Sequence, residues 1–332
     1  MFLMNSRLYK GKRIRRFFLL VICAAGFLAG GWVDPAYAAP KKHVIKFSTL
    51  APEGSSWMNE MRLLAKETKE ATEGNLVFKF YPGGVSGDEK DVIRKMRIGQ
   101  LHGAGFTGVG LGEILPAVRV FDLPFLFEND RQIQHIYEQM SGYFVQEFEK
   151  NGYILLGWVP VGWIHFFSRE KVQTVDDLKK SRPWMWEGDP LIQEAYQAMN
   201  VKPVPLSVTD VLLSLQTGMV DTVYASSQGA LALQWFTKVK YMSGFPMGYA
   251  TGGVLITKKK FNNLPEEYQE VLRKIGACHL KNLVRKIQID NARSIEVMVK
   301  NGIEISPLPG EKEIDRFREA GSAARRKLVG KL

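Results

Sequence analysis

The stretch from Arg182 to Gly229 constrains the fold more than any other part of this 332-residue chain. It begins with an extended run that carries two tryptophans, and an amphipathic helix follows at Pro190–Met199. A buried strand is expected at Val220–Ala225. Strands that alternate with helices at this spacing predict an α/β fold, in which ligands usually lie beyond the carboxyl ends of the strands. Because residues 184–189 and 224–228 occupy those ends, we expect the functional site there.

The first 38 residues have the features of a cleavable export signal. A basic segment at residues 10–16 precedes an apolar run from Phe17 to Val33, and residues 36–38 read Ala-Tyr-Ala, a small-x-small cleavage site. The mature chain is therefore expected to begin at Ala39 and to reside in the periplasm. Arg15-Arg16 resembles part of a twin-arginine signal, so the general secretory and the twin-arginine routes both remain open.

The rest of the chain has the composition of an ordinary globular protein. Removing the signal takes away six of the 45 Lys and Arg and one of the 34 Asp and Glu, which lowers the net charge from +11 to +6. The remaining charges are interspersed and form no basic tract among aromatic residues, which argues against nucleic acid as a partner. Cys278 is the single cysteine left, so no internal disulfide is expected. No later apolar run is long enough to cross a bilayer.

The first part of the mature chain predicts alternating strands and helices. Strands are expected at His43–Thr49, at Leu76–Tyr81 and near residues 103–106, with helices over residues 55–71 and 88–99 between them. This order is typical of a wound parallel sheet. The length of the chain leaves room for roughly two domains.

The later part predicts connections between two domains. Tyr153–Val161 and Trp163–Ser168 are interpreted as paired strands that cross between the domains, and another strand is expected at Tyr249–Thr257. The longest helical pattern runs from Leu264 to about Gly302, and its apolar positions suit a helix lying along both domains. A final helix is expected at Glu311–Leu328.

Gly103, Gly105 and Gly108 satisfy the dinucleotide pattern G-x-G-x-x-G. The pattern overlaps a predicted strand instead of following it, and Asp122 and Glu128 fit the required acidic position poorly. We interpret the segment as a glycine-rich strand end beside a cleft, and no cofactor is expected.

A serine hydrolase is the second hypothesis. Residues 225–229 read Ala-Ser-Ser-Gln-Gly and approximate the nucleophile elbow of α/β hydrolases, with Ser227 as the nucleophile. The only later histidine is His279, inside the long helical pattern, and no aspartate lies between it and Ser227. The five histidines show no spacing typical of a zinc site. Neither enzyme activity nor a metal is therefore expected.

Several segments together resemble the periplasmic solute-binding proteins of TRAP (tripartite ATP-independent periplasmic) transporters, in the DctP (dicarboxylate-binding) family. They follow the family order and cover nearly the whole mature chain. These segments are Phe47–Trp57, Tyr81–Glu89, Leu123–Phe127, Leu215–Asp221 and Thr237–Tyr241.

The resemblance implies two α/β lobes, joined by crossing strands and a long helix, that close on a small organic ligand. Lobe I is expected to comprise residues 39–161 and 250–289, and lobe II residues 162–249 and 290–332. The implied partner is a membrane permease of small and large subunits, driven by an ion gradient. A monomer is expected, with a dimer as the alternative, and a ligand-sensing receptor for a signalling partner remains a third hypothesis.

The resemblance also places a tryptophan where the family has a ligand-binding arginine. The family arginine lies seven residues after the aspartate of an Asp-Leu-Lys-Gly segment and forks onto a ligand carboxylate. Counted from Asp177, that position is Trp184, and Arg182 lies two residues earlier. A tryptophan offers apolar area and an aromatic face instead of a cation. We therefore expect an organic acid or other ligand with an apolar or aromatic body rather than a small dicarboxylate, and whether Arg182 reaches the site stays open.

The candidate ligand-binding residues lie at strand ends or near the expected cleft. Asp189 is instead expected to cap the helix that begins at Pro190, and Glu89 is interpreted as a favourable charge near a helix start. The candidates are Glu53, Thr107, Gly108, Trp163, Arg182, Trp184, Trp186, Glu187, Tyr224, Ser226 and Ser227.

Overall fold

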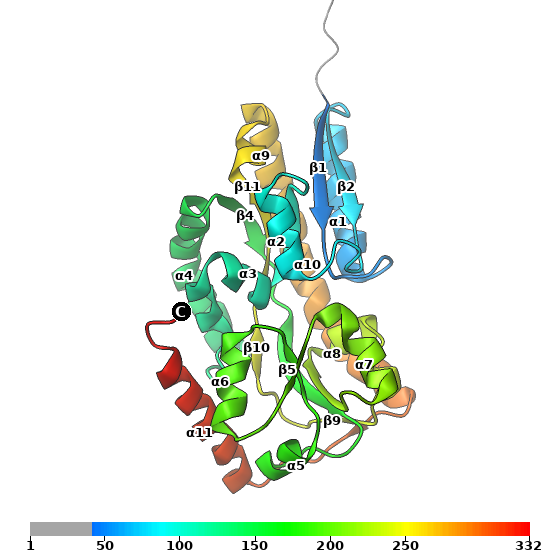
Figure 1. Ribbon diagram of the computed structural model, residues 1–332. Coiled ribbons are helices and arrows are strands. Elements are labelled where there is room, and N and C mark those ends of the chain that lie inside the picture. The colour runs from blue at the N-terminus through cyan, green and yellow to red at the C-terminus, as the bar shows by residue number, and fades with distance from the viewer. Residues whose placement is uncertain (1–41) are drawn as a thin grey trace, which may run out of the picture. The chain divides into compact units, whose positions relative to one another are not determined.

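The computed structural model describes residues 42–332, so the predicted export signal and its cleavage site lie outside the described residues. Residues 42–332 form an α/β structure with two five-stranded sheets and a small two-stranded sheet (Figure 1). This arrangement confirms the predicted fold class.

The first sheet has the strand order β2-β1-β3-β11-β4, in which β1 is parallel to β2 and β3, and β11 is antiparallel to β3 and β4. Side chains alternate between its two faces, as the pleat of a strand requires. Leu255 of β11 therefore packs into one core cluster, and its neighbours Val254 and Ile256 pack into the other. The five strands are β1 (His43–Ser48), β2 (Leu76–Tyr81), β3 (Gly103–Thr107), β4 (Tyr153–Trp158) and β11 (Gly252–Thr257).

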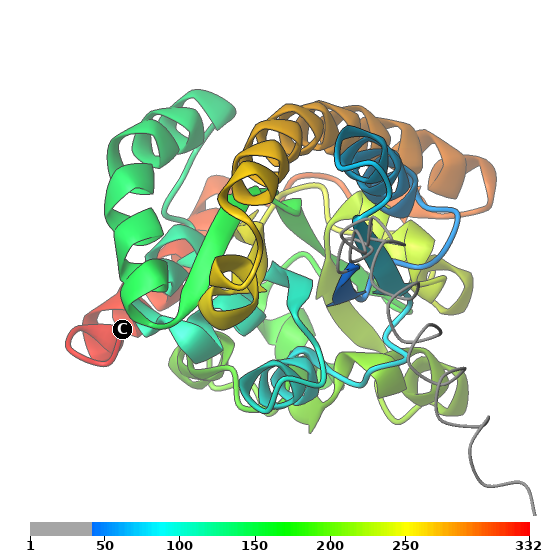
Figure 2. The same ribbon diagram turned by 90° about the horizontal axis from the view of Figure 1, so that it is seen from above.

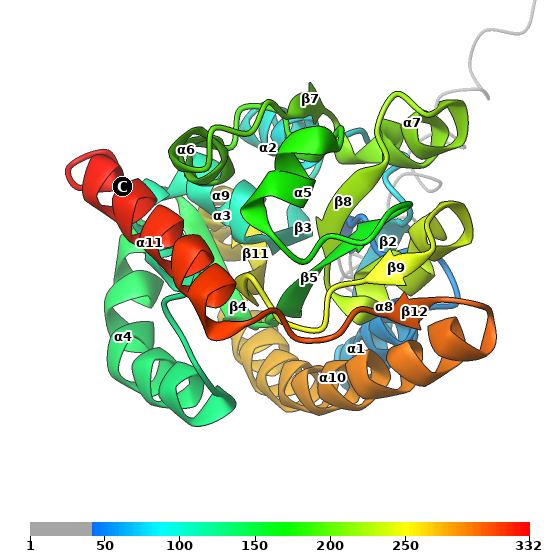
Figure 3. The same cartoon turned by 90° about the horizontal axis from the view of Figure 1, so that it is seen from below.

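Helices cover both faces of the first sheet. Helices α1 and α10 lie side by side on one face (Figures 2 and 3), and α2, α3 and α4 supply apolar side chains to the cluster on the other. The bounds in this part are α1 (Ser56–Ala71), α2 (Glu89–Arg97), α3 (Gly108–Ile114), the 3-10 helix η1 (Pro116–Asp122), α4 (Asp130–Lys150), α9 (Lys258–Asn262) and α10 (Glu266–Lys300).

The second sheet has the order β10-β5-β9-β12, with β8 also paired to β5, and β6 and β7 form the small parallel sheet. Helix α11 packs against α6. The strands are β5 (Gly162–Ser168), β6 (Trp184–Trp186), β7 (Val204–Leu206), β8 (Thr222–Ala225), β9 (Tyr241–Met242), β10 (Gly248–Ala250) and β12 (Glu304–Ile305). The helices are α5 (Val175–Lys180), α6 (Pro190–Ala198), η2 (Val208–Asp210), α7 (Val211–Thr217), α8 (Ser227–Ala232), η3 (Trp235–Lys238) and α11 (Glu311–Leu328).

The chain passes between the two sheets at residues 159–161 and again at Thr251. These two segments run side by side, because the Val159 N–H donates to the Gly252 carbonyl at 2.8 Å and the Val161 N–H donates to the Ala250 carbonyl at 2.9 Å. Helix α10 contacts α1 and β4 as well as α8 and β5, so it runs along both sheets as predicted.

The predicted pairing of the crossing strands is wrong. Strand β4 pairs with β11 in the first sheet, whereas β5 pairs with β8, β9 and β10 in the second. The strand expected at Tyr249–Thr257 is likewise divided at Thr251 into β10 and β11. The reason is that both crossing segments pass from one sheet to the other at the same level. Strand β4 therefore pairs with β11, and β5 pairs with β10, instead of β4 pairing with β5.

Candidate functional site

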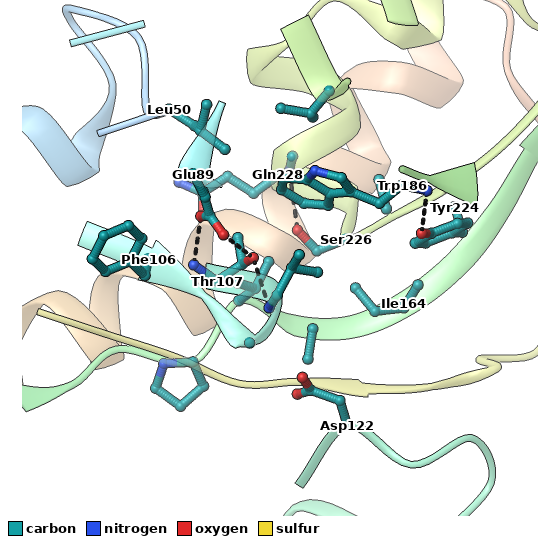
Figure 4. Close-up of a pocket in the computed structure, with 18 of the residues that line it drawn as sticks. Leu50, Glu89, Phe106, Thr107, Asp122, Ile164, Trp186, Tyr224, Ser226 and Gln228 are labelled. Carbon is teal, nitrogen blue, oxygen red and sulfur yellow. Dashed lines mark hydrogen bonds between the residues drawn. The ribbon is translucent and has the colours of Figure 1, made fainter. Parts of the chain in front are cut away.

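A cavity of about 250 Å³ lies beyond the carboxyl ends of strands from both sheets. Its wall includes the loop after β1, the end of β3, the crossing residues 159–161, the small strand β6 and the start of α8. Figure 4 shows side chains from these separate elements facing the same space. The cavity thus lies at the strand ends, where α/β proteins usually bind ligands.

One wall of the cavity is aromatic. The Trp184 side chain is 1% exposed, and its ring stacks on Tyr224 with centroids 4.7 Å apart and an interplanar angle of 23°. Trp235 meets Trp184 edge to face at 5.3 Å, and Trp186 lies 5.9 Å away. The Trp184 indole N–H donates to the Leu206 carbonyl at 3.0 Å, which satisfies its one polar atom. The wall is therefore a fixed apolar surface rather than a flexible one.

A buried carboxyl group faces the cavity from α2. Glu89 Oε1 accepts a hydrogen bond from the Thr107 N–H at 2.7 Å, and Oε2 accepts from Thr107 Oγ1 at 2.9 Å and from the Gly110 N–H at 2.7 Å. Burial raises the pKa of Glu89 from 4.5 to about 7, and these donors offset the effect only in part. Figure 4 shows Glu89 lying against Thr107.

A second buried polar cluster links the 3-10 helix η1 to the start of α6. Arg119 Nε donates to Asp122 Oδ2 at 2.8 Å, and its Nη2 donates to Asp189 Oδ2 at 3.0 Å. Burial alone would lower the pKa of Arg119, but the carboxylates of Asp189 and Asp122 outweigh it and raise that pKa. Burial raises the pKa of Asp122 to about 6, against the opposing effect of Arg119. Asp189 also caps α6 by accepting from the Leu191 N–H, as predicted.

Glycines allow these groups to approach the backbone closely. A Cβ at Gly108 would collide with the Asp122 carboxylate, and one at Gly110 would collide with Glu89 and the Phe106 ring. The close packing of two carboxyl groups thus explains Gly108 and Gly110, whereas a Cβ at Gly105 would collide with the Trp57 ring and one at Gly103 with the Leu255 carbonyl. The predicted reading of this segment as a strand end beside a cleft is confirmed.

Six of the eleven candidate residues line the cavity. They come from β3 and the start of α3, from β6, and from the end of β8 with the residue that follows it. The six are Thr107, Gly108, Trp184, Trp186, Tyr224 and Ser226.

The other five candidates lie outside the cavity wall. Arg182 and Glu53 are exposed and paired, Arg182 Nε with Asp221 at 3.1 Å and Glu53 with Arg62 at 2.6 Å. The Glu187 backbone carbonyl accepts from Lys90, while its side chain is exposed.

The remaining two are Trp163 and Ser227. The Trp163 indole N–H donates to Asp130 at 2.8 Å, and its ring packs edge to face on Tyr249. Ser227 is buried in the first turn of α8, and its side chain is not part of the cavity wall.

Sequence reasoning did not select four notable residues of the wall, which are Trp57, Glu89, Arg119 and Asp122. The only local signal for Arg119 and Asp122 was a pair of opposite charges inside the otherwise apolar segment 114–127. Because Asp189 lies 70 positions from Arg119, no sequence pattern links them.

The geometry required of a serine hydrolase is not present at Ser227. His279 lies in α10, and its two ring nitrogens lie 2.7 Å from Glu60 and 2.8 Å from Glu67, both on α1. Both nitrogens are thus engaged with carboxylates and not with the serine. Among residues 42–332, no group of three or more His, Cys, Asp or Glu is arranged to hold a metal ion. Within the same residues, no helix is both long and apolar enough to span a membrane.

Known proteins share this sequence pattern and fold. The chain is 26% identical to the 2,3-diketo-L-gulonate-binding periplasmic protein of Escherichia coli, over 71% of this chain and 73% of that protein. Its fold matches a TRAP periplasmic solute-binding protein from Desulfovibrio salexigens with bound orotic acid (TM-score 0.80, 21% identity, 87% and 93% coverage). A TRAP periplasmic solute-binding protein from Pseudomonas putida with bound D-glucuronate matches equally well (TM-score 0.80, 23% identity, 87% and 94% coverage).

The family assignment rests on a match to a family model that spans almost the whole described chain. The model of the DctP family, described as bacterial extracellular solute-binding protein, family 7, covers residues 47–331. The chain therefore belongs to bacterial extracellular solute-binding protein family 7.

Proposed function

We propose that this receptor captures a small organic ligand with an apolar or aromatic body in the cavity between its two sheets. Members of its family are solute receptors and not enzymes. The observation that carries the proposal is the aromatic wall, in which Trp184 is fully buried and stacked on Tyr224. A wall of this kind binds by apolar contact and stacking, and it cannot form the bidentate ion pair of an arginine.

The two parts of the chain would act as lobes that close on the ligand. Lobe I would comprise residues 39–161 and 250–289, and lobe II residues 162–249 and 290–332. Asp88, the N-cap of α2, supports this view because its carboxylate accepts from the Trp186 indole N–H at 3.0 Å and from Ser207 Oγ at 2.7 Å. Such contacts favour a closed state over an open one.

The ligand would then pass to a TRAP permease of small and large membrane subunits, driven by an ion gradient. Export through the signal at residues 1–38 would place the receptor in the periplasm, where the named relatives reside. It would work as a monomer without a cofactor.

A thermal-shift screen of residues 39–332 tests the proposal, with aromatic and branched apolar compounds set against small dicarboxylates. A ligand at a hundred times its Kd should stabilise the fold by about 2.7 kcal/mol. The shift should disappear in Trp184→Ala and persist in Trp163→Ala, because Trp163 lies outside the cavity wall. A response to small dicarboxylates alone would contradict the proposed ligand class.

A further inference from the structure

Acidic side chains outnumber basic ones around the cavity. All the lining residues belong to the described part of the chain, and they include no lysine and no histidine. They include one arginine, Arg119, and three acidic residues, Glu89, Asp122 and Asp189. A ligand carboxylate therefore has only one cation on the wall with which it could pair.

That cation is already balanced by the protein. Arg119 lies between two carboxylates at 2.8 and 3.0 Å, and its side chain is 6% exposed. With all three groups ionised, the cluster carries one positive and two negative charges. An anion that approached Arg119 would also approach Asp122 and Asp189, and in a buried site like charges repel strongly.

Backbone donors at two places on the wall, the starts of α3 and α8, are also occupied. Around β3 and α3, the N–H groups of Thr107 and Gly110 donate to Glu89, and the Val109 N–H donates to Thr107 Oγ1. At the start of α8, the Gln228 N–H donates to Asn291 Oδ1 and the Gly229 N–H donates to Ser226 Oγ. The protein thus supplies its own acceptors where a ligand carboxylate would need donors.

The Ser226 hydroxyl is different. Its oxygen accepts from the Gly229 N–H, and within residues 42–332 no hydrogen bond donated by this hydroxyl is found. Its proton is therefore available to an acceptor on the ligand, and an amide, ketone or hydroxyl oxygen would suffice. The cavity offers polar recognition without a positive charge.

We propose that the cavity selects ligands that carry no carboxylate, either neutral or cationic, because its only arginine is held between two carboxylates and the backbone donors at the starts of α3 and α8 are already bonded. This inference rests on the proposed function, since it narrows the ligand class of the same cavity. Under this inference, the chain differs from an acid-binding receptor in the charge of the ligand that it binds and not in the apolar body of that ligand.

A matched compound series provides the first test. Aromatic bodies of one shape are offered as the acid, the amide and the amine, for example indole-3-acetate, indole-3-acetamide and tryptamine, and melting shifts are recorded. Shifts from amides or amines with none from the acids support the inference. Shifts from the acids alone overturn it and leave the proposed function standing. If no compound of any charge binds, the proposed function is contradicted, and the second test decides the charge of the cavity.

The second test needs no ligand. Ala232 lines the cavity at the end of α8, and Cys278 is an exposed thiol on α10. The variant Ala232→Cys with Cys278→Ser is treated with methanethiosulfonates that differ only in charge, and the rates are normalised to a neutral reagent. The reference is Cys278 in the unchanged protein.

The cation-to-anion rate ratio at the cavity thiol should exceed the ratio at Cys278 by at least about tenfold, the scale on which a cleft of one charge sign concentrates counter-ions. Adding Glu89→Gln should lower the ratio. An equal or lower ratio at the cavity thiol overturns the inference. Because the mature chain carries a net positive charge, a higher ratio at the cavity cannot come from the charge of the whole protein.

Discussion

Glu89 keeps a carboxyl group inside the protein, where three donors surround it. Burial raises its pKa from 4.5 to about 7, so the folded protein retains a proton that the unfolded chain has already released above about pH 4.5. The folded state therefore binds more protons between pH 4.5 and 7, and the stabilisation due to this group falls as the pH rises through that window. Asp122, whose pKa burial raises to about 6, contributes in the same direction.

Glu89→Gln should remove this pH dependence while keeping the shape of the side chain. Between pH 4.5 and 7.5, the wild-type free energy of unfolding should fall by about 3 kcal/mol more than that of the variant, since one pKa unit corresponds to about 1.4 kcal/mol. Urea unfolding at a series of pH values measures both curves.

Asp176→Asn serves as the control. Hydrogen bonds from Arg316 and Lys179 hold the pKa of this exposed carboxylate at about 2, below the window, so its curve should run parallel to the wild type. If the free energy of unfolding changed with pH in parallel for wild type and Glu89→Gln, the assignment of this pH dependence to Glu89 would be contradicted.

Sequence reasoning identified wall residues at the ends of strands, such as Thr107 and Ser226, and the family resemblance identified Trp184. It could not reach the Arg119 cluster, because the contact depends on two segments 70 positions apart that meet only in the folded chain. It also placed Arg182 among the candidates, since strand periodicity gives the face of a residue but not its partner, here Asp221.

Helix α10 is an element on which sequence and structure agree closely, because a long apolar period is set by local spacing alone. The strand pairs were harder to predict, because pairing of β4 with β11 and of β5 with β10 joins residues far apart in sequence. Asn291 on α10 ties these elements together. Its Nδ2 donates to the Val161 carbonyl at 3.0 Å, and its Oδ1 accepts from the Gln228 N–H at 3.0 Å.

Asn291→Ala should destabilise the protein by about 1–3 kcal/mol, because a partly buried carbonyl in the crossing segment and an N–H in the first turn of α8 both lose their partner. Chemical denaturation measures the loss. Asn282→Ala on the same helix is the matched control, since Asn282 is exposed and should change stability by less than about 0.5 kcal/mol. Equal effects of the two substitutions would show that Asn291 does not join these elements.

At the scale of the whole molecule, direct polar contacts link α2 to the small sheet and to the segment that follows it. Asp88 accepts from Trp186, Ser207 and the Val208 N–H, and Lys90 Nζ donates to the Glu187 carbonyl at 3.1 Å. The Asp88 contacts surround a single carboxylate, so its charge strengthens each hydrogen bond.

Asp88→Asn should weaken ligand binding about tenfold, which corresponds to about 1.4 kcal/mol and to the lower end of the range for a hydrogen bond to a charged group. An asparagine still caps α2, so the helix itself should persist. Isothermal titration with a ligand identified by the screen measures the change.

Asp91→Asn on the same helix is the control, because within residues 42–332 the Asp91 side chain bonds to Arg94 and the Asp88 N–H and not to the small sheet. The control should bind as the wild type does. An unchanged Kd for Asp88→Asn would show that Asp88 does not contribute to the contacts that favour the closed state.

Strand β11 occupies the fourth position in the first sheet, between β3 and β4, although it is the last of the five to be synthesised. Until residue 257 has been made, β3 and β4 have no strand between them, and the sheet cannot close. A nascent chain would therefore remain loosely folded through most of its synthesis. Because β11 joins β3 to β4 only once residue 257 is available, completion of the first sheet has to wait until most of the chain is present.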